Sequence, residues 1–282
     1  CDLLYNWRNT IVNTRAYGKD PELVIKNAKA YVRGVRESGL AVCCKHFPGD
    51  GVEELDQHLV MGVNTMECDE WDSTFGHVYK EMIDSGIQSI MAGHIALPEY
   101  SRKLRPGIKD EDIMPATLAP ELITDLLRGK LGFNGLVLTD ASHMAGMTAA
   151  MPRSQQVPGA IAAGCDMFLF FNDIEEDFGY MMDGYRNGII TEERLTDALR
   201  RILGLKASLK LHEKKKKGTL IPEKEGLSVV GCAEHLAMAA EAAKKSITLV
   251  KDTQHNLPVT PKTHKRAYAF VISSPPISRK NQ

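Results

Sequence analysis

The stretch Leu40-Ala41-Val42-Cys43-Cys44-Lys45-His46-Phe47-Pro48-Gly49-Asp50-Gly51 joins a short apolar run to a polar turn. Residues 40–44 have the length and composition of a buried strand, and a Pro-Gly turn follows them. The polar loop continues to His58, and from Lys45 onward it holds one Lys, two His, two Asp and two Glu. The stretch therefore predicts a buried strand that presents a group of polar side chains at its end.

Helices and apolar strands alternate along residues 1–211. We expect helices over 21–38, 68–85, 120–131, 157–163, 178–186 and 191–211, and strands over 40–44, 87–91, 135–139 and 166–171. Asp20 and Pro21 have the residue types of an N-cap and a first helical position. Buried strands that alternate with amphipathic helices are typical of a parallel sheet covered by helices, which places the chain in the α/β class.

Polar residues follow the predicted strands at their carboxyl ends. They are Lys45-His46, His94, Asp140 and Asn172. In a (β/α)8 barrel the carboxyl ends of the strands form the active face. The pattern therefore predicts a TIM-like barrel with its chemistry at that face.

The C-terminal part of the chain has a different organisation. Residues 212–246 contain the lysine run 214–217 and an Ala-rich helix over 232–245, and we expect them to form a linker and a helix. Strands are predicted over 247–251 and 267–272. Residues 247–282 are therefore expected to begin a second α/β domain.

The composition describes a globular protein with ample core material. Of 282 residues, 43% are hydrophobic and 25% are charged, and the formal net charge is −1. Such a charge argues against a nucleic-acid binder, for which a basic excess is expected, so small neutral partners fit better. The sequence shows no signal peptide and no apolar run long enough to span a bilayer, although the chain opens on Cys1 and a targeting segment could lie upstream.

The six cysteines indicate a reducing compartment. They are spread singly, apart from Cys43-Cys44 in the apolar run. Neighbouring strand residues point to opposite faces, so these two are expected to be small core side chains and not a disulfide. We therefore expect a cytoplasmic location. The oligomeric state does not follow from the sequence.

The spacing of Asp56 and His58 leaves three interpretations of the polar loop. It can be a solvated connection. It can hold a proton-transfer pair, because a carboxylate two residues before a histidine can orient the imidazole and leave one ring nitrogen free. It can also bind a metal, with His46, Asp50, Asp56 and His58 as ligands. None of the familiar zinc spacings is present, so we expect neither a metal nor a cofactor.

Four motifs in order resemble those of a known family. Lys45-His46-Phe47-Pro48-Gly49 with Asp56-x-His58 resembles the signature of the β-N-acetylglucosaminidases of glycoside hydrolase family 3. Similar motifs of that family correspond to Asn13-Thr14-Arg15-Ala16-Tyr17-Gly18-Lys19-Asp20-Pro21, Met91-Ala92-Gly93-His94 and Leu138-Thr139-Asp140. The resemblance covers roughly residues 2 to 270.

The resemblance implies a retaining exo-glycosidase that hydrolyses terminal β-N-acetylglucosamine from a small-molecule or oligosaccharide substrate, with cell-wall sugars as one source. Asp140 would be the nucleophile that forms a covalent glycosyl intermediate, and His58 with Asp56 would replace the second carboxylate of most retaining enzymes. Arg15, Lys45, His46 and His94 match positions that bind or lie near the sugar. Because the acid/base is neutral, phosphate can compete with water as the acceptor.

The chain departs from the family pattern at three places. Asp50 stands where a His is frequent, Gln57 replaces a usual Ser, and Ala141-Ser142-His143-Met144 follows Asp140 where many relatives have another acid and a Leu. These departures affect subsite specificity more than the type of reaction.

Two alternatives to the hexosaminidase stay open. One is a β-glucosidase, against which the Asp56-Gln57-His58 element argues. The other is a non-catalytic sugar-binding fragment, since the barrel of the family has strands before the point where this chain starts. The barrel is accordingly expected to be incomplete at its N-terminus.

Overall fold

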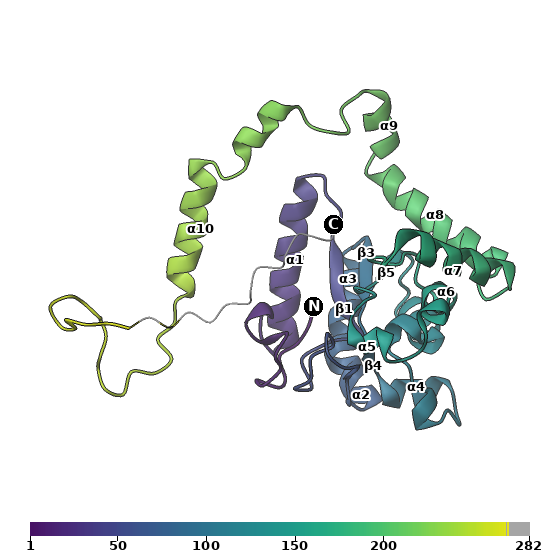
Figure 1. Ribbon diagram of the computed structural model, residues 1–282, viewed down its shortest axis with the longest axis horizontal. Coiled ribbons are helices and arrows are strands. Elements are labelled where there is room, and N and C mark those ends of the chain that lie inside the picture. The colour runs from purple at the N-terminus through teal and green to yellow at the C-terminus, as the bar shows by residue number, and fades with distance from the viewer. Residues whose placement is uncertain (269, 271–282) are drawn as a thin grey trace. The chain divides into compact units, whose positions relative to one another are not determined.

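The computed structural model describes residues 1–268 and 270, which fall into two compact units, one over Cys1–Leu220 and one that begins at Ile221 (Figure 1). The strands of the first unit are β1 (Cys43–Phe47), β2 (Gly62–Val63), β3 (Ser89–Ala92), β4 (Ile95–Ala96) and β5 (Leu136–Thr139). Its helices are α1 (Pro21–Glu37), α2 (Cys68–Trp71), α3 (His77–Asp84), α4 (Pro98–Leu104), α5 (Ala145–Thr148), α6 (Arg153–Ala163), α7 (Ile174–Arg186), α8 (Glu192–Ser208) and α9 (Leu211–Lys216). Shorter or tighter turns are η1 (Asn13–Arg15), η3 (Asp110–Asp112) and η4 (Ala116–Leu118), and two π-helices are η2 (Asp72–Gly76) and η5 (Glu121–Lys130).

A parallel three-stranded sheet lies at the centre of the first unit, as predicted. Its strand order is β1-β3-β5, so each neighbouring pair is joined by a crossover that contains helices. The predicted fourth strand over 166–171 is reduced to a single parallel bridge between Leu138 and Met167. The prediction of a full strand there was wrong, because the N–H of Leu169 donates to the side-chain Oγ1 of Thr139 and not to a backbone carbonyl, and Phe170 has a positive φ of 54°. β2 and β4 form a separate parallel pair.

β1 carries the polar residues within the strand and not after it. The strand was predicted over 40–44, but it runs from Cys43 to Phe47, so Lys45 and His46 lie inside it. Its register against β3 shifts between Cys44 and Phe47, where β1 contains one residue more than its partner. Such a bulge changes the direction of the side chains beside it.

The adjacent cysteines of β1 differ in burial. Cys44 is buried as predicted, whereas Cys43 on the opposite face is exposed. The expectation that both belong to the core was therefore wrong for Cys43. All six cysteines are free thiols.

The helices cover the sheet through apolar stripes at helical spacing. In α1, Val24, Ala28 and Val32 are buried, and this helix packs beside α3 (Figure 1). Asp20 is the N-cap of α1 as predicted, because its side chain accepts a hydrogen bond from the N–H of Glu22 at 3.0 Å. The predicted helix over 68–85 is present as the continuous run α2, η2 and α3.

An aromatic cluster supports the loop after β1. Trp71 lies edge-on to Phe47 and to Tyr100, and all three side chains are buried. The indole N–H of Trp71 donates to the carbonyl of Pro48 at 2.9 Å, which satisfies the one polar atom of the ring inside the core. The core therefore holds the backbone of the Pro48-Gly49 turn directly.

In the second unit the described elements are η6 (Lys224–Val229) and α10 (Ala233–Ser246), which confirms the predicted Ala-rich helix. The strand predicted over 247–251 is absent, and Ile247 and Val250 are exposed. A lone strand has no partner for its backbone polar groups, and none is present within the described residues of this unit. Most of the strand predicted over 267–272 lies outside the described residues.

Within residues 1–268 and 270, no helix combines the length and the apolar character needed to cross a bilayer.

Candidate active site

His46 lies between two carboxylates. Asp2 holds it from one side, with Oδ2 at 2.8 Å from Nδ1 and Oδ1 accepting from the backbone N–H of His46 at 2.9 Å. On the other side, Nε2 lies 3.8 Å from Oδ2 of Asp140. The side chains of all three residues are largely buried. The imidazole therefore joins the start of the chain to the end of β5.

The two flanking carboxylates change the protonation of His46. Burial lowers the pKa of His46, but the charge and hydrogen bond of Asp2 and the charge of Asp140 together raise it above its ordinary value. Burial raises the pKa of Asp2, but the charge of His46 and its side-chain and backbone hydrogen bonds bring that pKa below its ordinary value. Asp2 and His46 are thus arranged as an ion pair beside Asp140.

Asp140 follows the last residue of β5. Its backbone N–H donates to the carbonyl of Ala92 at 2.8 Å, which extends the β3–β5 ladder to this position. One carboxylate oxygen, Oδ1, accepts from the N–H of Ala141 at 2.7 Å. The other oxygen faces His46, so the carboxylate has a defined orientation at the carboxyl end of the sheet.

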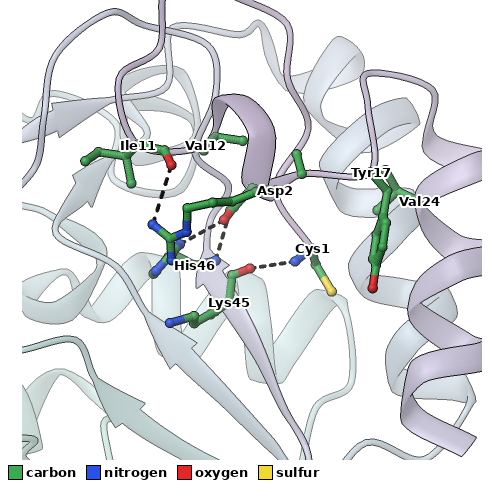
Figure 2. Close-up of a pocket in the computed structure, with 10 residues that line it drawn as sticks. Cys1, Asp2, Ile11, Val12, Tyr17, Val24, Lys45 and His46 are labelled. Carbon is green, nitrogen blue, oxygen red and sulfur yellow. Dashed lines mark hydrogen bonds and ion pairs between the residues drawn. The ribbon is translucent and has the colours of Figure 1, made fainter. Parts of the chain in front are cut away.

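Arg15 and Lys45 line a cavity of about 120 Å³ together with Asp2 and His46. Figure 2 shows Asp2, Lys45 and His46 side by side, with the N–H of Cys1 on the carbonyl of Lys45 at 2.6 Å. Arg15 lies in η1 and donates from Nη1 to the carbonyl of Ile11 at 3.5 Å. Both cationic side chains are exposed, so they can reach a ligand in the cavity.

His94 is buried next to the segment that follows β5. Its Nε2 donates to the carbonyl of Ala141 at 2.9 Å, and Nδ1 lies 3.0 Å from Oγ1 of Thr117. Burial lowers the pKa of His94, against smaller opposing effects of the Ala141 hydrogen bond and the charge of Asp140. Because both ring nitrogens have protein partners, His94 contacts the backbone next to Asp140 and has no free nitrogen for a ligand.

Asp56 and His58 form a pair on the surface of the loop. Oδ1 of Asp56 lies 2.7 Å from Nδ1 of His58 and accepts from its backbone N–H at 2.8 Å. The side chain of His58 is 55% exposed, so Nε2 is open to solvent. Among residues 1–268, no hydrogen bond joins this pair directly to Asp140.

A buried polar network lies beneath the loop. Asp50 accepts from Asn9 Nδ2 at 3.0 Å and from Gln57 Nε2 at 3.1 Å, and Gln57 Oε1 accepts from the N–H of His94 at 3.1 Å. Burial and the nearby charge of Asp2 raise the pKa of Asp50. The network connects the N-terminal segment, the loop and the residues next to Asp140.

The comparisons with known proteins agree with these motifs. Residues 1–205 match the model described as the glycosyl hydrolase family 3 N terminal domain. The chain belongs to glycoside hydrolase family 3.

The relatives found by sequence include two named glycosidases. A beta-N-acetylglucosaminidase/beta-glucosidase from Cellulomonas fimi is 51% identical over 273 residues, which are 97% of this chain and 48% of that protein. A beta-hexosaminidase from Chromobacterium violaceum is 32% identical over 169 residues, 60% of this chain and 44% of that protein.

The solved structures include the beta-glucoside phosphorylase BglX, which is 44% identical with a TM-score of 0.86; the match covers 93% of this chain and 47% of that one. A beta-N-acetylhexosaminidase from Beutenbergia cavernae is 27% identical with a TM-score of 0.64, and the match covers 73% of this chain and 60% of that one. This chain spans about half the length of the curated relatives it matches.

The structure therefore brings together some of the residues from the family 3 motifs but not all of them. The structure brings together His46 and Asp140, and it places Arg15 and Lys45 on the same cavity as His46. It forms the Asp56–His58 pair at a separate place on the loop. The roles of these residues stay predictions.

Sequence reasoning gave no role to Asp2, Asn9 or Thr117. In the sequence, each of these three is a polar residue beside an apolar segment, which is a common feature of surface residues. What distinguishes them is contact with residues 44, 41 and 23 positions away, respectively. Such contacts become visible only in three dimensions.

Within the described residues, no group of three or more His, Cys, Asp or Glu side chains has the arrangement of a metal site.

Proposed function

We propose that this chain carries the catalytic centre of a retaining exo-glycosidase that hydrolyses terminal β-N-acetylglucosamine. The observation that carries the proposal is the contact of the Asp140 carboxylate with His46, at the carboxyl end of a parallel sheet and beside a cavity lined by Arg15 and Lys45. An oriented carboxylate at that edge can attack an anomeric carbon, while cationic donors hold the sugar hydroxyls.

In the first step, Asp140 attacks the anomeric carbon and the glycosidic bond breaks. Protonated His58 gives its Nε2 proton to the departing oxygen, and Asp56 stabilises the imidazolium. In the second step, neutral His58 takes a proton from water as the water oxygen attacks the same carbon. The glycosyl–Asp140 bond then breaks, and the sugar leaves with its original anomeric configuration.

The exposed position of His58 requires a change of side-chain orientation. The acid/base must approach the glycosidic oxygen, so we propose that the side chains of Asp56 and His58 turn toward a sugar seated against Asp140, while the backbone of residues 57 and 58 keeps its hydrogen bonds to Gly146 and Ala145. His94 acts on the nucleophile through the carbonyl of Ala141 and not on the sugar itself. Arg15, Lys45 and His46 bind the sugar hydroxyls in this proposal.

The wider architecture is part of the same proposal. Residues 1–211 belong to the C-terminal part of a TIM-like (β/α)8 barrel, 212–246 connect, and 247–282 begin a second α/β domain. The parallel order β1-β3-β5 supports the barrel. A cytoplasmic location is supported by the free thiols of all six cysteines.

Phosphorolysis is a second candidate. It is favoured by the similarity to the solved beta-glucoside phosphorylase BglX over 93% of this chain. In this variant a phosphate oxygen replaces water in the second step and the product is a sugar 1-phosphate. A neutral histidine as acid/base does not repel that anion as a carboxylate would.

The experiment is the release of p-nitrophenol from the β-N-acetylglucosaminide and from the β-glucoside, with and without inorganic phosphate. We expect turnover of the first substrate and its loss in Asp140→Asn. Activity that survives Asp140→Asn contradicts the assigned nucleophile, and absence of turnover of both substrates contradicts the catalytic function of this chain. Sugar 1-phosphate as the main product establishes phosphorolysis in place of hydrolysis.

A further inference from the structure

Gln57 separates the two members of the surface pair, yet it points into the protein. Its side chain belongs to a residue that is only 2% exposed, whereas the neighbouring His58 is exposed. Both ends of its amide are used inside the protein. Nε2 donates to Oδ2 of Asp50 at 3.1 Å, and Oε1 accepts from the N–H of His94 at 3.1 Å.

The carboxylate of Asp50 acts only as an acceptor in this network. Its Oδ1 accepts from Asn9 Nδ2 at 3.0 Å and from the N–H of Gly51 at 2.6 Å, while Oδ2 accepts from Gln57. A carboxylate with donors on both oxygens selects one orientation of the Gln57 amide, because the opposite orientation would place oxygen against oxygen and Nε2 against an N–H.

The backbone on either side of Gln57 is bound to the segment that follows Asp140. The carbonyl of Gln57 accepts from the N–H of Gly146, and the carbonyl of His58 accepts from the N–H of Ala145, both at 3.1 Å. A Cβ atom at Gly146 would lie 2.8 Å from the carbonyl oxygen of Gln57, so only glycine permits this approach. The loop is thereby seated on α5 at the base of the Asp56–His58 pair.

The same network reaches the position of the nucleophile. Gln57 binds the backbone of His94, and the ring of His94 binds the carbonyl of Ala141, which follows Asp140 directly. A chain of hydrogen bonds therefore runs from Asp50 through Gln57 and His94 to the residue next to Asp140. The two positions at which this loop departs from the family pattern, 50 and 57, are in contact with each other.

We propose that Asp50 and Gln57 form a positioning pair that sets the location of the Asp56–His58 acid/base relative to Asp140. The inference rests on the proposed glycosidase function. Neither residue touches the substrate; both act through the backbone of the loop that carries Asp56 and His58. Loss of the pair displaces the proton donor while leaving the nucleophile and the sugar-binding residues in place.

The hydrogen-bond pattern defines a set of variants. In Asp50→Asn, the new amide nitrogen faces another donor, either Gln57 Nε2 or Asn9 Nδ2. Rotating the amide of Gln57 or of Asn9 relieves this donor–donor contact only by turning the rotated nitrogen toward a backbone N–H. Gln57→Glu places two carboxylates against each other.

The double variant, Asp50→Asn with Gln57→Glu, removes both conflicts. The new amide oxygen at position 50 accepts from Asn9 and Gly51, and the new amide nitrogen there donates to the new carboxylate at position 57. That carboxylate also accepts from the N–H of His94. The exchange therefore restores every hydrogen bond with the charge on the other residue.

The readout is kcat/KM for two aryl β-N-acetylglucosaminides, one with phenol and one with 2,4-dinitrophenol as leaving group. Phenol needs a proton donor to depart and dinitrophenol does not, so only the first substrate reports the position of His58. General acid catalysis contributes about 10²–10⁴-fold, so we expect each single variant to lose roughly ten- to a hundredfold on the phenyl substrate and less than about threefold on the other. The double variant is expected to return to within about threefold of the original chain.

The matched control is Glu54→Gln, which removes a carboxylate from the same loop. Glu54 is exposed, and its partner among the described residues is Arg8 at the surface, so both kcat/KM values should stay unchanged. Equal losses on the two substrates, or a double variant that loses as much as the two single losses combined, would overturn the positioning pair. Absence of turnover in the unmodified chain would instead overturn the glycosidase function and the inference with it.

Discussion

Asp2 holds His46 through two hydrogen bonds, one to the ring at 2.8 Å and one to the backbone at 2.9 Å, and thereby turns the other ring nitrogen toward Asp140. The carboxylate of Asp2 is thus the residue that gives His46 its charge and its direction. His46 belongs to the motif Lys45–Gly49, but its charge and its orientation depend on Asp2, which lies outside that motif.

Asp2→Asn is expected to destabilise the fold and to weaken sugar binding. The substitution leaves a buried imidazole without its counter-charge, so the free energy of unfolding should fall by about 3 kcal/mol. It should also lower the pKa of His46, because burial then opposes the charged form with less compensation. Denaturant unfolding and an NMR titration of His46 measure the two effects.

The stability difference between the original chain and Asp2→Asn should depend on pH. The pKa of His46 is raised, so the stability from its charged form is complete below its ordinary value of 6.5 and is lost as pH rises through the folded value. The pKa of Asp2 is lowered, so its contribution is present above 3.8 and is lost as pH falls below it. A difference that grows above pH 6.5 would contradict this pairing.

His94 is expected to stay neutral with its proton on Nε2. That nitrogen donates to the carbonyl of Ala141, and burial lowers the pKa of the ring. Nitrogen-15 NMR of the imidazole should show the Nε2–H tautomer and a titration midpoint below that of a free histidine. A proton on Nδ1, or a midpoint above the ordinary value, would remove the proposed link to the nucleophile position.

Glu53→Gln is expected to flatten the dependence of stability on pH. Burial raises the pKa of Glu53 to about 7, against the hydrogen bond it accepts from the N–H of Val63. An acid with a raised pKa loses stability as pH rises from its ordinary value of 4.5 through about 7, because ionisation is unfavourable in the folded state. The glutamine variant keeps the acceptor without the charge. Thermal unfolding at intervals across that range should show the variant gaining relative to the original chain as pH rises.

Gly51→Ala is expected to lower the free energy of unfolding by more than about 2 kcal/mol. Gly51 has a φ of +113°, and an added Cβ would lie 2.1 Å from the carbonyl oxygen of Leu3. The carbonyl of Gly51 also accepts from Tyr5 and Asn6, so the clash would displace the N-terminal segment. Denaturant unfolding measures the loss.

The matched control is Gly34→Ala in the exposed interior of α1, where nothing beyond the neighbouring residues and backbone of its own helix lies within 4 Å of the added Cβ. Helix propensity predicts a gain of about 0.5–1 kcal/mol there. A similar effect of the two substitutions would contradict the close approach at Gly51.

The local parts of the structure followed from the sequence more closely than the long-range ones. The N-cap at Asp20 and the parallel strands could be predicted because residue types and periodicity within about ten positions determine them. The pairing of Asp56 with His58 also came from spacing alone. The bulge in β1 could not be predicted, because the shift of register depends on contact with β3.

The buried partners of the candidate site needed the fold. Asp2, Asn9 and Thr117 acquire their roles from strands and turns distant in sequence. The prediction of a strand over 247–251 was wrong because apolar residues with β propensity form a strand only where a neighbouring strand is present to pair with them.

The contact of Asp2 with His46 spans 44 positions, that of Asn9 with Asp50 spans 41, and that of His94 with Ala141 spans 47. Residues 45–58 placed in another scaffold would therefore keep the motif, but His46 would lose the contacts that set its protonation state and its orientation. A designer who wants this chemistry elsewhere must transfer four separated segments together, around Asp2, His46, His94 and Ala141.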